Sequence, residues 1–73
     1  MEEWIRRRRE RALESPVRRE MLTLLDRQEC SIRELHEQLS GDRSLREVNH
    51  HLAVLQDAEL VWGEKGRYWR LGR

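Results

Sequence analysis

Three side chains that can read a nucleic acid, those of Arg46, Asn49 and His50, lie close together in the sequence. Arginine can form two hydrogen bonds to a guanine edge, and asparagine can do the same with adenine. The apolar residues of this segment recur at the spacing of one helix face, and they are Leu45, Val48, Leu52 and Leu55. We therefore expect residues 44–57 to form a helix that turns Arg46, Asn49, His50 and the small Ala53 outward.

Helix starts are marked by capping patterns along the chain. Ser15 precedes Pro16, and proline is favoured at the first helical position because its missing N–H costs nothing there. Residues 31–34 and 44–47 both read Ser-x-x-Glu, the capping box in which both side chains satisfy free backbone N–H groups. Helices are predicted to begin at these points. Ser44 and the N-terminus of the helix that follows it could hold a phosphate.

Two further apolar stripes predict the helices that must support the reading helix. They consist of Val17, Met21, Leu24 and Leu25, and of Ile32, Leu35 and Leu39. With the reading helix they predict a three-helix core over residues 15–61. Residues 1–14 are expected to form a preceding helix, because Glu2 and Glu3 stand four positions before Arg6 and Arg7.

After this core the pattern changes to that of short strands. Two β-prone runs, residues 60–62 and 68–71, flank the glycine-containing residues 63–66. This arrangement predicts a β-hairpin over residues 60–71. Alternation along the second run predicts that Trp69 fills the core, and Lys65 and Arg67 fall at the hairpin tip.

The order of four helices and a hairpin predicts the fold class, which is mostly α with a small β-hairpin, a winged helix-turn-helix. A chain of 73 residues is one domain at most, so the domain is expected to span residues 1–73. In such a fold, residues 44–57 would be the recognition helix that enters the major groove of DNA. The hairpin would be the wing, with Lys65 and Arg67 contacting the DNA backbone.

Four segments of the sequence resemble ArsR-type bacterial regulators, and together they run from Ser15 to Leu71. They are SPVRREMLTLL, SIRELHEQL, VNHHLAVLQDAELV and GRYWRL. In this order they are similar to the opening core helix, the first helix of the helix-turn-helix, the recognition helix with its exit, and the closing strand of the wing. The resemblance implies a transcriptional regulator that binds double-stranded DNA sequence-specifically, as a homodimer.

The chain departs from this family at positions that matter for metal sensing. Ser31 and Arg33 stand where metal-sensing members carry cysteines, and Cys30 is one residue early. The histidines and this cysteine match no known zinc spacing, so we expect neither a metal nor another cofactor. The turn between Leu39 and Val48 is also about two residues longer than is usual in the family.

The homodimer is expected to use the N-terminal helix. Members of the family usually add a helix after the wing that helps to form the dimer, and this chain stops at Arg73. The apolar residues of this helix are expected to dock it on the core or on a second subunit, and they are Trp4, Ile5, Ala12 and Leu13. Any dimer interface is predicted to use Trp4, Ile5 and Leu13.

The charge balance leaves a second class of protein open. Fifteen basic and fourteen acidic side chains give a net charge of +1, which lacks the basic excess of many nucleic-acid-binding domains. The alternative is a winged-helix module that binds another protein and does not bind DNA. An exposed Trp62 would support such a partner surface.

Other classes find no support in the sequence. No convincing nucleophile and base, glycine-rich phosphate loop or acid pair is present, so we do not expect an enzyme. No apolar run is long enough for a membrane span. With Cys30 as the single cysteine, no internal disulfide can form, and we expect a cytoplasmic protein.

Two expectations concern polar residues outside the reading face. His51 borders the apolar stripe, so we expect a structural histidine held by a hydrogen bond. Residues 6–9 are all arginine, but on a helix they fan around most of a turn. They are predicted to form a solvated face paired with Glu2, Glu3 and Glu10, in preference to a phosphate-binding patch.

Overall fold

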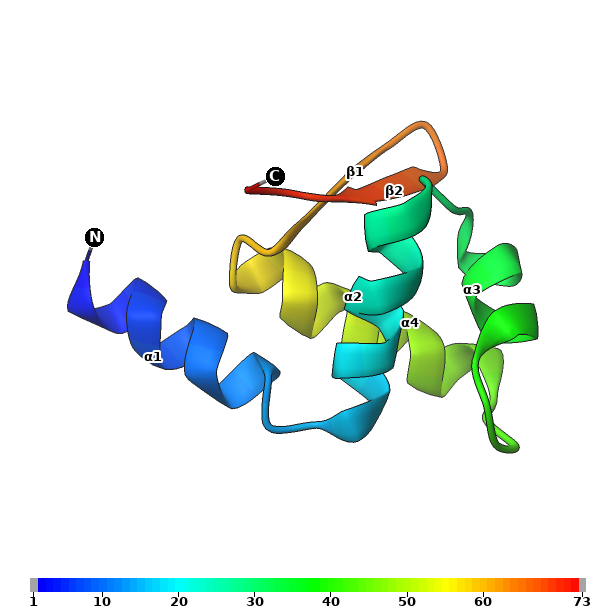
Figure 1. The fold of residues 1–73 in the computed structure, drawn as a ribbon, viewed down its shortest axis with the longest axis horizontal. Helices are drawn as coiled ribbons and strands as arrows, with labels where there is room; N and C mark the ends of the chain where they lie inside the picture. The colour runs from blue at the N-terminus through cyan, green and yellow to red at the C-terminus, as the bar shows by residue number, and fades with distance from the viewer. Residues whose placement is uncertain (1, 73) are drawn as a thin grey trace.

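The computed structural model describes residues 2–72. Over this range the chain forms four helices, α1 (Glu3–Ala12), α2 (Pro16–Arg27), α3 (Ile32–Gln38) and α4 (Leu45–Asp57). They are followed by an antiparallel hairpin of β1 (Val61–Glu64) and β2 (Arg67–Arg70) (Figure 1). The predicted fold class is confirmed: the protein is mostly helical with a small β-hairpin, consistent with a winged helix-turn-helix.

The helices begin where the capping patterns predicted. The Ser15 hydroxyl accepts a hydrogen bond from the Arg18 N–H at 3.3 Å, and Pro16 is the first residue of α2. Complete capping boxes precede α3 and α4. In the first of them, Ser31 and Glu34 exchange hydrogen bonds of 2.8 and 3.1 Å between side chain and backbone. Local chemistry therefore sets the start of each core helix.

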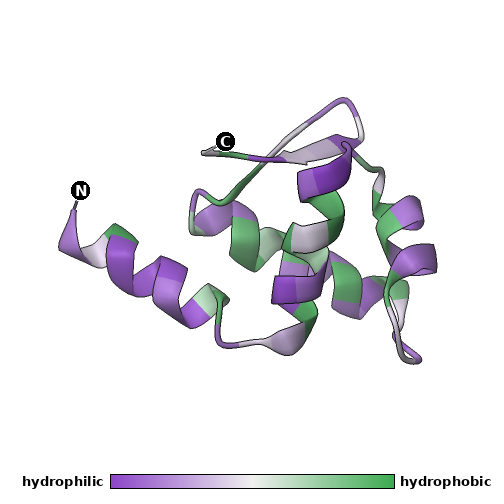
Figure 2. Ribbon diagram, in the orientation of Figure 1, coloured by the Kyte–Doolittle hydropathy of each residue, from purple (hydrophilic) through white to green (hydrophobic). Residues whose placement is uncertain are grey.

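The core lies between α2, α3, α4 and the hairpin, and Figure 2 shows α1 as mostly hydrophilic beside it. Its largest fully buried side chains are those of Met21, Leu25, Leu35, Leu52 and Leu55. Leu22 is also buried, although the predicted stripe of α2 omitted it. Leu45 was predicted to be in the core but is 40% exposed. It is the first residue of α4, and side chains on a helix lean toward its N-terminus, which carries this one past the core.

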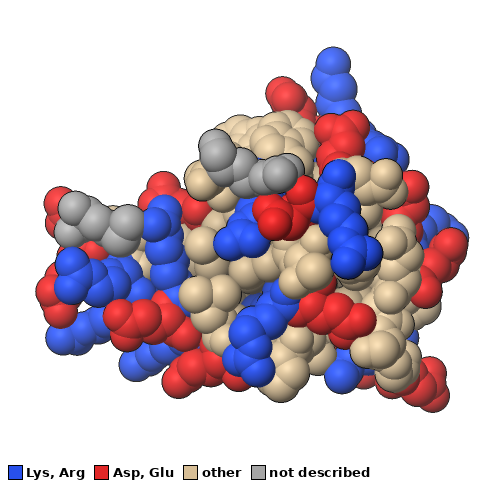
Figure 3. Space-filling model, in the orientation of Figure 1, with Lys and Arg blue, Asp and Glu red and all other residues tan. Residues whose placement is uncertain are grey.

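Helix α1 packs beside the C-terminal end of α4, far from the hairpin tip (Figure 1). Its buried residues are Ile5 and Ala12. The rest of its surface is dominated by charge, and Figure 3 shows Lys and Arg side chains interspersed with Asp and Glu over this helix. The apolar contact between α1 and the body of the protein is therefore a narrow strip.

The hairpin register decides which aromatic residue packs on the core. Trp62 pairs with Trp69, and Gly63 pairs with Tyr68. Directly opposed residues share one face of a sheet, so the two tryptophans lie together on one face and Tyr68 lies on the other. Tyr68 packs against the core, while Trp62 is 53% exposed. The prediction that Trp69 fills the core is therefore wrong, because the second strand presents its other face.

Two backbone contacts explain this choice of face. Tyr68 exchanges backbone hydrogen bonds of 2.9 and 2.8 Å with Cys30, in the segment between α2 and α3. Cys30 therefore pairs with the edge of β2 that does not face β1. A Cβ atom at Gly63 would lie 2.4 Å from two ring carbons of Tyr68, so only glycine allows the ring to cover this position.

Candidate nucleic-acid interface

Helix α4 has one fully buried and one fully exposed face. Val48, Leu52 and Leu55 are at most 1% exposed and fix the inner face. The residues predicted to face outward are all exposed, and they are Arg46, Asn49, His50 and Ala53. Their polar groups are presented from one rigid helix whose orientation is set by the core.

Ser44, the residue before α4, is the N-cap of this helix. The Ser44 hydroxyl accepts a hydrogen bond from the Glu47 N–H at 3.1 Å, and the Ser44 N–H donates to the Glu47 carboxylate at 3.5 Å. A phosphate at this terminus would meet the Glu47 carboxylate, and like charges repel. The structure therefore gives Ser44 a capping role, and it weakens the expectation that Ser44 holds a phosphate.

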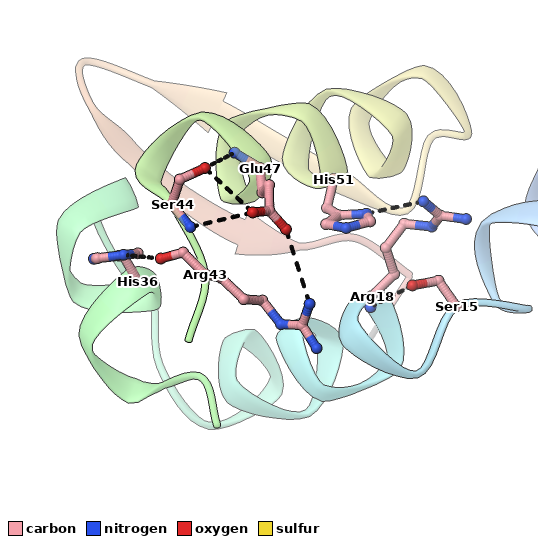
Figure 4. A network of polar contacts seen from close by, with 7 residues as sticks. All are labelled: Ser15, Arg18, His36, Arg43, Ser44, Glu47 and His51. Atoms are coloured by element: carbon pink, nitrogen blue, oxygen red, sulfur yellow. Dashed lines mark hydrogen bonds and ion pairs between the residues drawn. The ribbon is translucent and has the colours of Figure 1, made fainter. Parts of the chain in front are cut away.

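The turn between α3 and α4 is held from three helices, and Figure 4 shows the contacts made by His36 and Arg43. His36 of α3 donates from Nε2 to the Arg43 carbonyl at 2.5 Å, and the Arg43 guanidinium lies 4.0 Å from the Glu47 carboxylate of α4. Glu20 of α2 accepts hydrogen bonds from the Ser40 N–H at 3.1 Å and hydroxyl at 2.9 Å. These contacts hold the turn in place, and they orient α4 relative to α3.

Sequence reasoning missed Arg43 and Glu20, because neither lies on an apolar stripe or in a capping pattern. The only signal was the length of the turn itself, since two extra residues need partners to be held in place.

His51 joins α4 to the first two helices. Arg18 donates to His51 Nδ1 at 3.0 Å (Figure 4). It also donates to the carbonyl oxygens of Ala12 at 2.7 Å and Arg11 at 3.3 Å. A guanidinium cannot accept a hydrogen bond, so His51 Nδ1 must be unprotonated here. His51 is thus a hydrogen-bonded structural histidine, as predicted.

The surroundings of His51 favour its neutral form. Burial is the main cause that lowers the pKa of this ring. The nearby positive charges of Arg18, His50 and Arg43 lower the pKa further, and Glu47 opposes them weakly. The link between α2 and α4 therefore depends on a neutral imidazole.

The two basic residues of the hairpin have different surroundings. The Arg67 guanidinium lies 2.8 Å from the Glu34 carboxylate and 3.5 Å from that of Glu29, and it also donates to the Glu29 carbonyl at 3.2 Å. It therefore ties β2 to the start of α3, in contrast to the expectation that it contacts the DNA backbone. Lys65 remains as the exposed cation at the hairpin tip.

The ion pair between Arg67 and Glu34 also affects the pKa of Glu34. Hydrogen bonds from the Ser31 backbone and hydroxyl are the leading causes that lower the pKa of Glu34, and the Arg67 guanidinium adds to the effect. Glu34 therefore serves the capping box and the hairpin contact at once. Such a double role ties the position of the wing to the start of α3.

The three residues predicted to form a dimer interface do not make one surface. Ile5 is only 6% exposed and is buried within its own chain, whereas Trp4 and Leu13 are 51% and 38% exposed. Trp4 and Leu13 are nine positions apart (13 − 4). At about 100° per residue this puts them on opposite sides of the helix. At most one of these two sides can face a second subunit through α1.

The consecutive arginines of α1 have separate partners. Arg7 pairs with Glu3 on its own helix at 3.4 Å, as the sequence suggested. Arg8 instead lies 3.3 Å from Asp57 of α4, and Arg9 Nε donates to the Ala58 carbonyl at 3.2 Å. Arg8 and Arg9 therefore reach the C-terminal end of α4, which local spacing alone could not indicate.

Two capped helices joined by a fixed turn and followed by a hairpin define a helix-turn-helix protein with one wing. Residues 13–62 match the family described as helix-turn-helix domain. This match covers most of the chain, which therefore belongs to that family. No curated protein and no solved structure matches the chain.

Three observations concern metal binding, the single cysteine and membrane spanning. Within residues 2–72, no group of three or more His, Cys, Asp or Glu side chains is placed to hold a metal ion. Cys30 is fully buried, and this burial is the main cause that raises the pKa of its thiol. In the same range, no helix is both long and apolar enough to cross a membrane.

Proposed function

We propose that this protein is a transcriptional regulator of the ArsR type that binds double-stranded DNA sequence-specifically through α4. The observation that carries the proposal is the outward face of α4, which lies opposite a fully buried stripe in a helix-turn-helix domain. The major groove of B-DNA admits one α-helix, and side chains on its outer face reach the base edges. Helix α4 meets this requirement.

Each outward residue has a role that its chemistry supports. Arg46 and Asn49 are the base readers, because both can bond a base through two atoms. His50 lies beside them, and Ala53 allows close approach or contact with a thymine methyl group. Lys65 contacts a backbone phosphate from the wing. This is a binding function without catalysis.

The proposal includes a cytoplasmic homodimer, as in the family that the sequence resembles. A dimeric helix-turn-helix protein binds two half-sites that are one helical turn apart. Of the α1 residues, Leu13 is the one that we assign to the second subunit, because Ile5 is buried and the side of Trp4 faces α4 through Arg8.

A protein-interaction module remains the second candidate, and one observation favours it. Trp62 is 53% exposed and shares the outer face of the hairpin with Trp69. A tryptophan this exposed, beside the half-buried ring of Trp69, fits an apolar patch that contacts a partner. This candidate predicts weak binding to any duplex.

The salt dependence of duplex binding separates the two candidates. A DNA-binding protein releases counterions, so the logarithm of its binding constant falls steeply with the logarithm of salt concentration. We expect this slope for random duplex, and we expect selection from genomic fragments to enrich a specific site. Negligible binding at low salt, with no enriched sequence, would favour the interaction module.

A further inference from the structure

The outward stripe of α4 ends in an acid. Asp57 follows Arg46, His50 and Ala53 at the spacing of one helix face, and its side chain is 70% exposed. Asp57 lies eleven positions after Arg46 (57 − 46), which is about 16 Å along a helix. The major groove is only about 12 Å wide, so a helix of this length reaches from the base edges to the phosphates at the groove border.

Helix α1 brings Arg8 to this end of the stripe. The Arg8 guanidinium lies 3.3 Å from the Asp57 carboxylate, and it also lies over the Trp4 ring at 4.8 Å from the ring centre. An aromatic face attracts a guanidinium and holds it in place. The Arg8 side chain is still 50% exposed, so a phosphate can reach it.

We propose that Arg8 contacts a DNA backbone phosphate and forms a second flank of the DNA interface, opposite the wing. This inference rests on the proposed function. A carboxylate beside phosphates is repelled, and Arg8 neutralises Asp57 at the place where that repulsion would be felt. The guanidinium carries five N–H donors, so one ion pair leaves donors for a phosphate. Trp4 then has the role of positioning Arg8.

The neighbouring arginines provide the contrast. Arg7 is paired with Glu3, and its helix position points about 100° away from that of Arg8. Arg9 bonds the Ala58 carbonyl and is partly buried, so it docks α1 on α4. Of these three arginines, Arg8 alone is exposed and contacts the outward stripe of α4, through its ion pair with Asp57.

The test compares Arg8→Gln with Arg7→Gln in the full chain, since each variant loses one positive charge from adjacent positions of one helix. Binding to random duplex is measured as a function of salt. We expect Arg8→Gln to weaken binding several-fold and to reduce the slope by about one unit, with no change in sequence preference. Arg7→Gln should change the slope much less. Equal effects of the two variants would show a net-charge effect and would overturn the proposal.

Two further variants separate phosphate contact from simple docking of α1. Asp57→Asn should tighten binding, because it removes the repelled acid and leaves Arg8 in place. The double variant Arg8→Gln with Asp57→Asn restores the parent net charge. The proposal predicts that its slope stays reduced, whereas a slope equal to that of the parent would contradict it. Thermal unfolding of each variant checks that α1 remains docked.

Failure of this inference can be distinguished from failure of the proposed function. If Arg46→Ala loses sequence preference while Arg8→Gln behaves like Arg7→Gln, only the flank on α1 is wrong. If the parent protein shows no salt-dependent binding to duplex, both are wrong.

Discussion

At the scale of single residues, His51 links α4 to α2 through one hydrogen bond that requires a neutral imidazole. Its Nδ1 accepts from Arg18, and Arg18 also bonds the end of α1. Protonation of His51 would replace this hydrogen bond by a contact between two cations. The neutral ring is therefore part of the packing between α1, α2 and α4.

This link predicts how stability changes with pH. The pKa of His51 is lowered in the folded protein, so the unfolded chain binds more protons in the window just below the ordinary histidine pKa of about 6.5. The contribution of His51 is fully present above that pH and is lost as pH falls below it. We expect the parent to lose more thermal stability than His51→Gln between pH 7.5 and about pH 5.5.

The control for this prediction is His50→Gln, which changes an exposed neighbour outside the Arg18 contact. It should keep most of the pH dependence of the parent. Identical pH profiles for the parent and His51→Gln would rule out the proposed role of the His51 proton.

The two cations of the hairpin predict opposite behaviour on substitution. Lys65→Gln should leave stability unchanged and reduce the salt slope of DNA binding by about one unit, because it removes the proposed phosphate contact. Arg67→Gln should lower the free energy of unfolding slightly, since its partially exposed ion pairs hold β2 against α3. Denaturant titration and duplex binding measure the two effects.

A larger change of slope for Arg67→Gln than for Lys65→Gln would mean that Arg67 leaves Glu34 and contacts DNA. The original expectation of two phosphate contacts from the wing would then hold.

At the scale of elements, helix starts could be predicted from the sequence because their chemistry is local. Ser31 and Ser44 each find their partner three residues later, so the pattern contains both halves of the contact. The exposed and buried faces of α4 followed from spacing for the same reason. Leu45 was the exception, since its burial depended on whether another element extends over the first turn.

The face of the hairpin could not be predicted in this way. Residues 68–71 contain aromatic or apolar residues on both faces, so alternation alone fits either one. The choice depends on the backbone bonds between Tyr68 and Cys30, which are far apart in the sequence. The contacts of Arg67 with Glu34 and of Arg8 with Asp57 are also tertiary, and neither leaves a local pattern.

At the scale of the whole molecule, the net charge is only +1, so attraction to DNA depends on where the basic groups lie. Acids and bases are interspersed over α1 in Figure 3, so general attraction to DNA is expected to be modest. The proposed interface gathers its cations at three places, which are the α4 face, the wing tip and the Arg8 flank. Affinity then depends on these few contacts.

Assembly can be tested on the intact chain. We expect light scattering to show a homodimer, and Leu13→Glu to shift it toward monomer by placing a charge in the contact. Trp4→Ala, on the opposite side of α1, should leave the dimer intact. A monomer for the intact chain at micromolar concentration would contradict the assignment.

The central claim is that α4 reads bases, and its most direct test is the affinity of Arg46→Ala and Asn49→Ala for the selected site. Each substitution should cost about 1–3 kcal/mol of binding free energy on that site and relax the preference at one base pair. Circular dichroism identical to that of the parent would exclude unfolding as the cause. If both variants keep the parent affinity and preference, α4 is not the reading element, and the protein-interaction module becomes the better account.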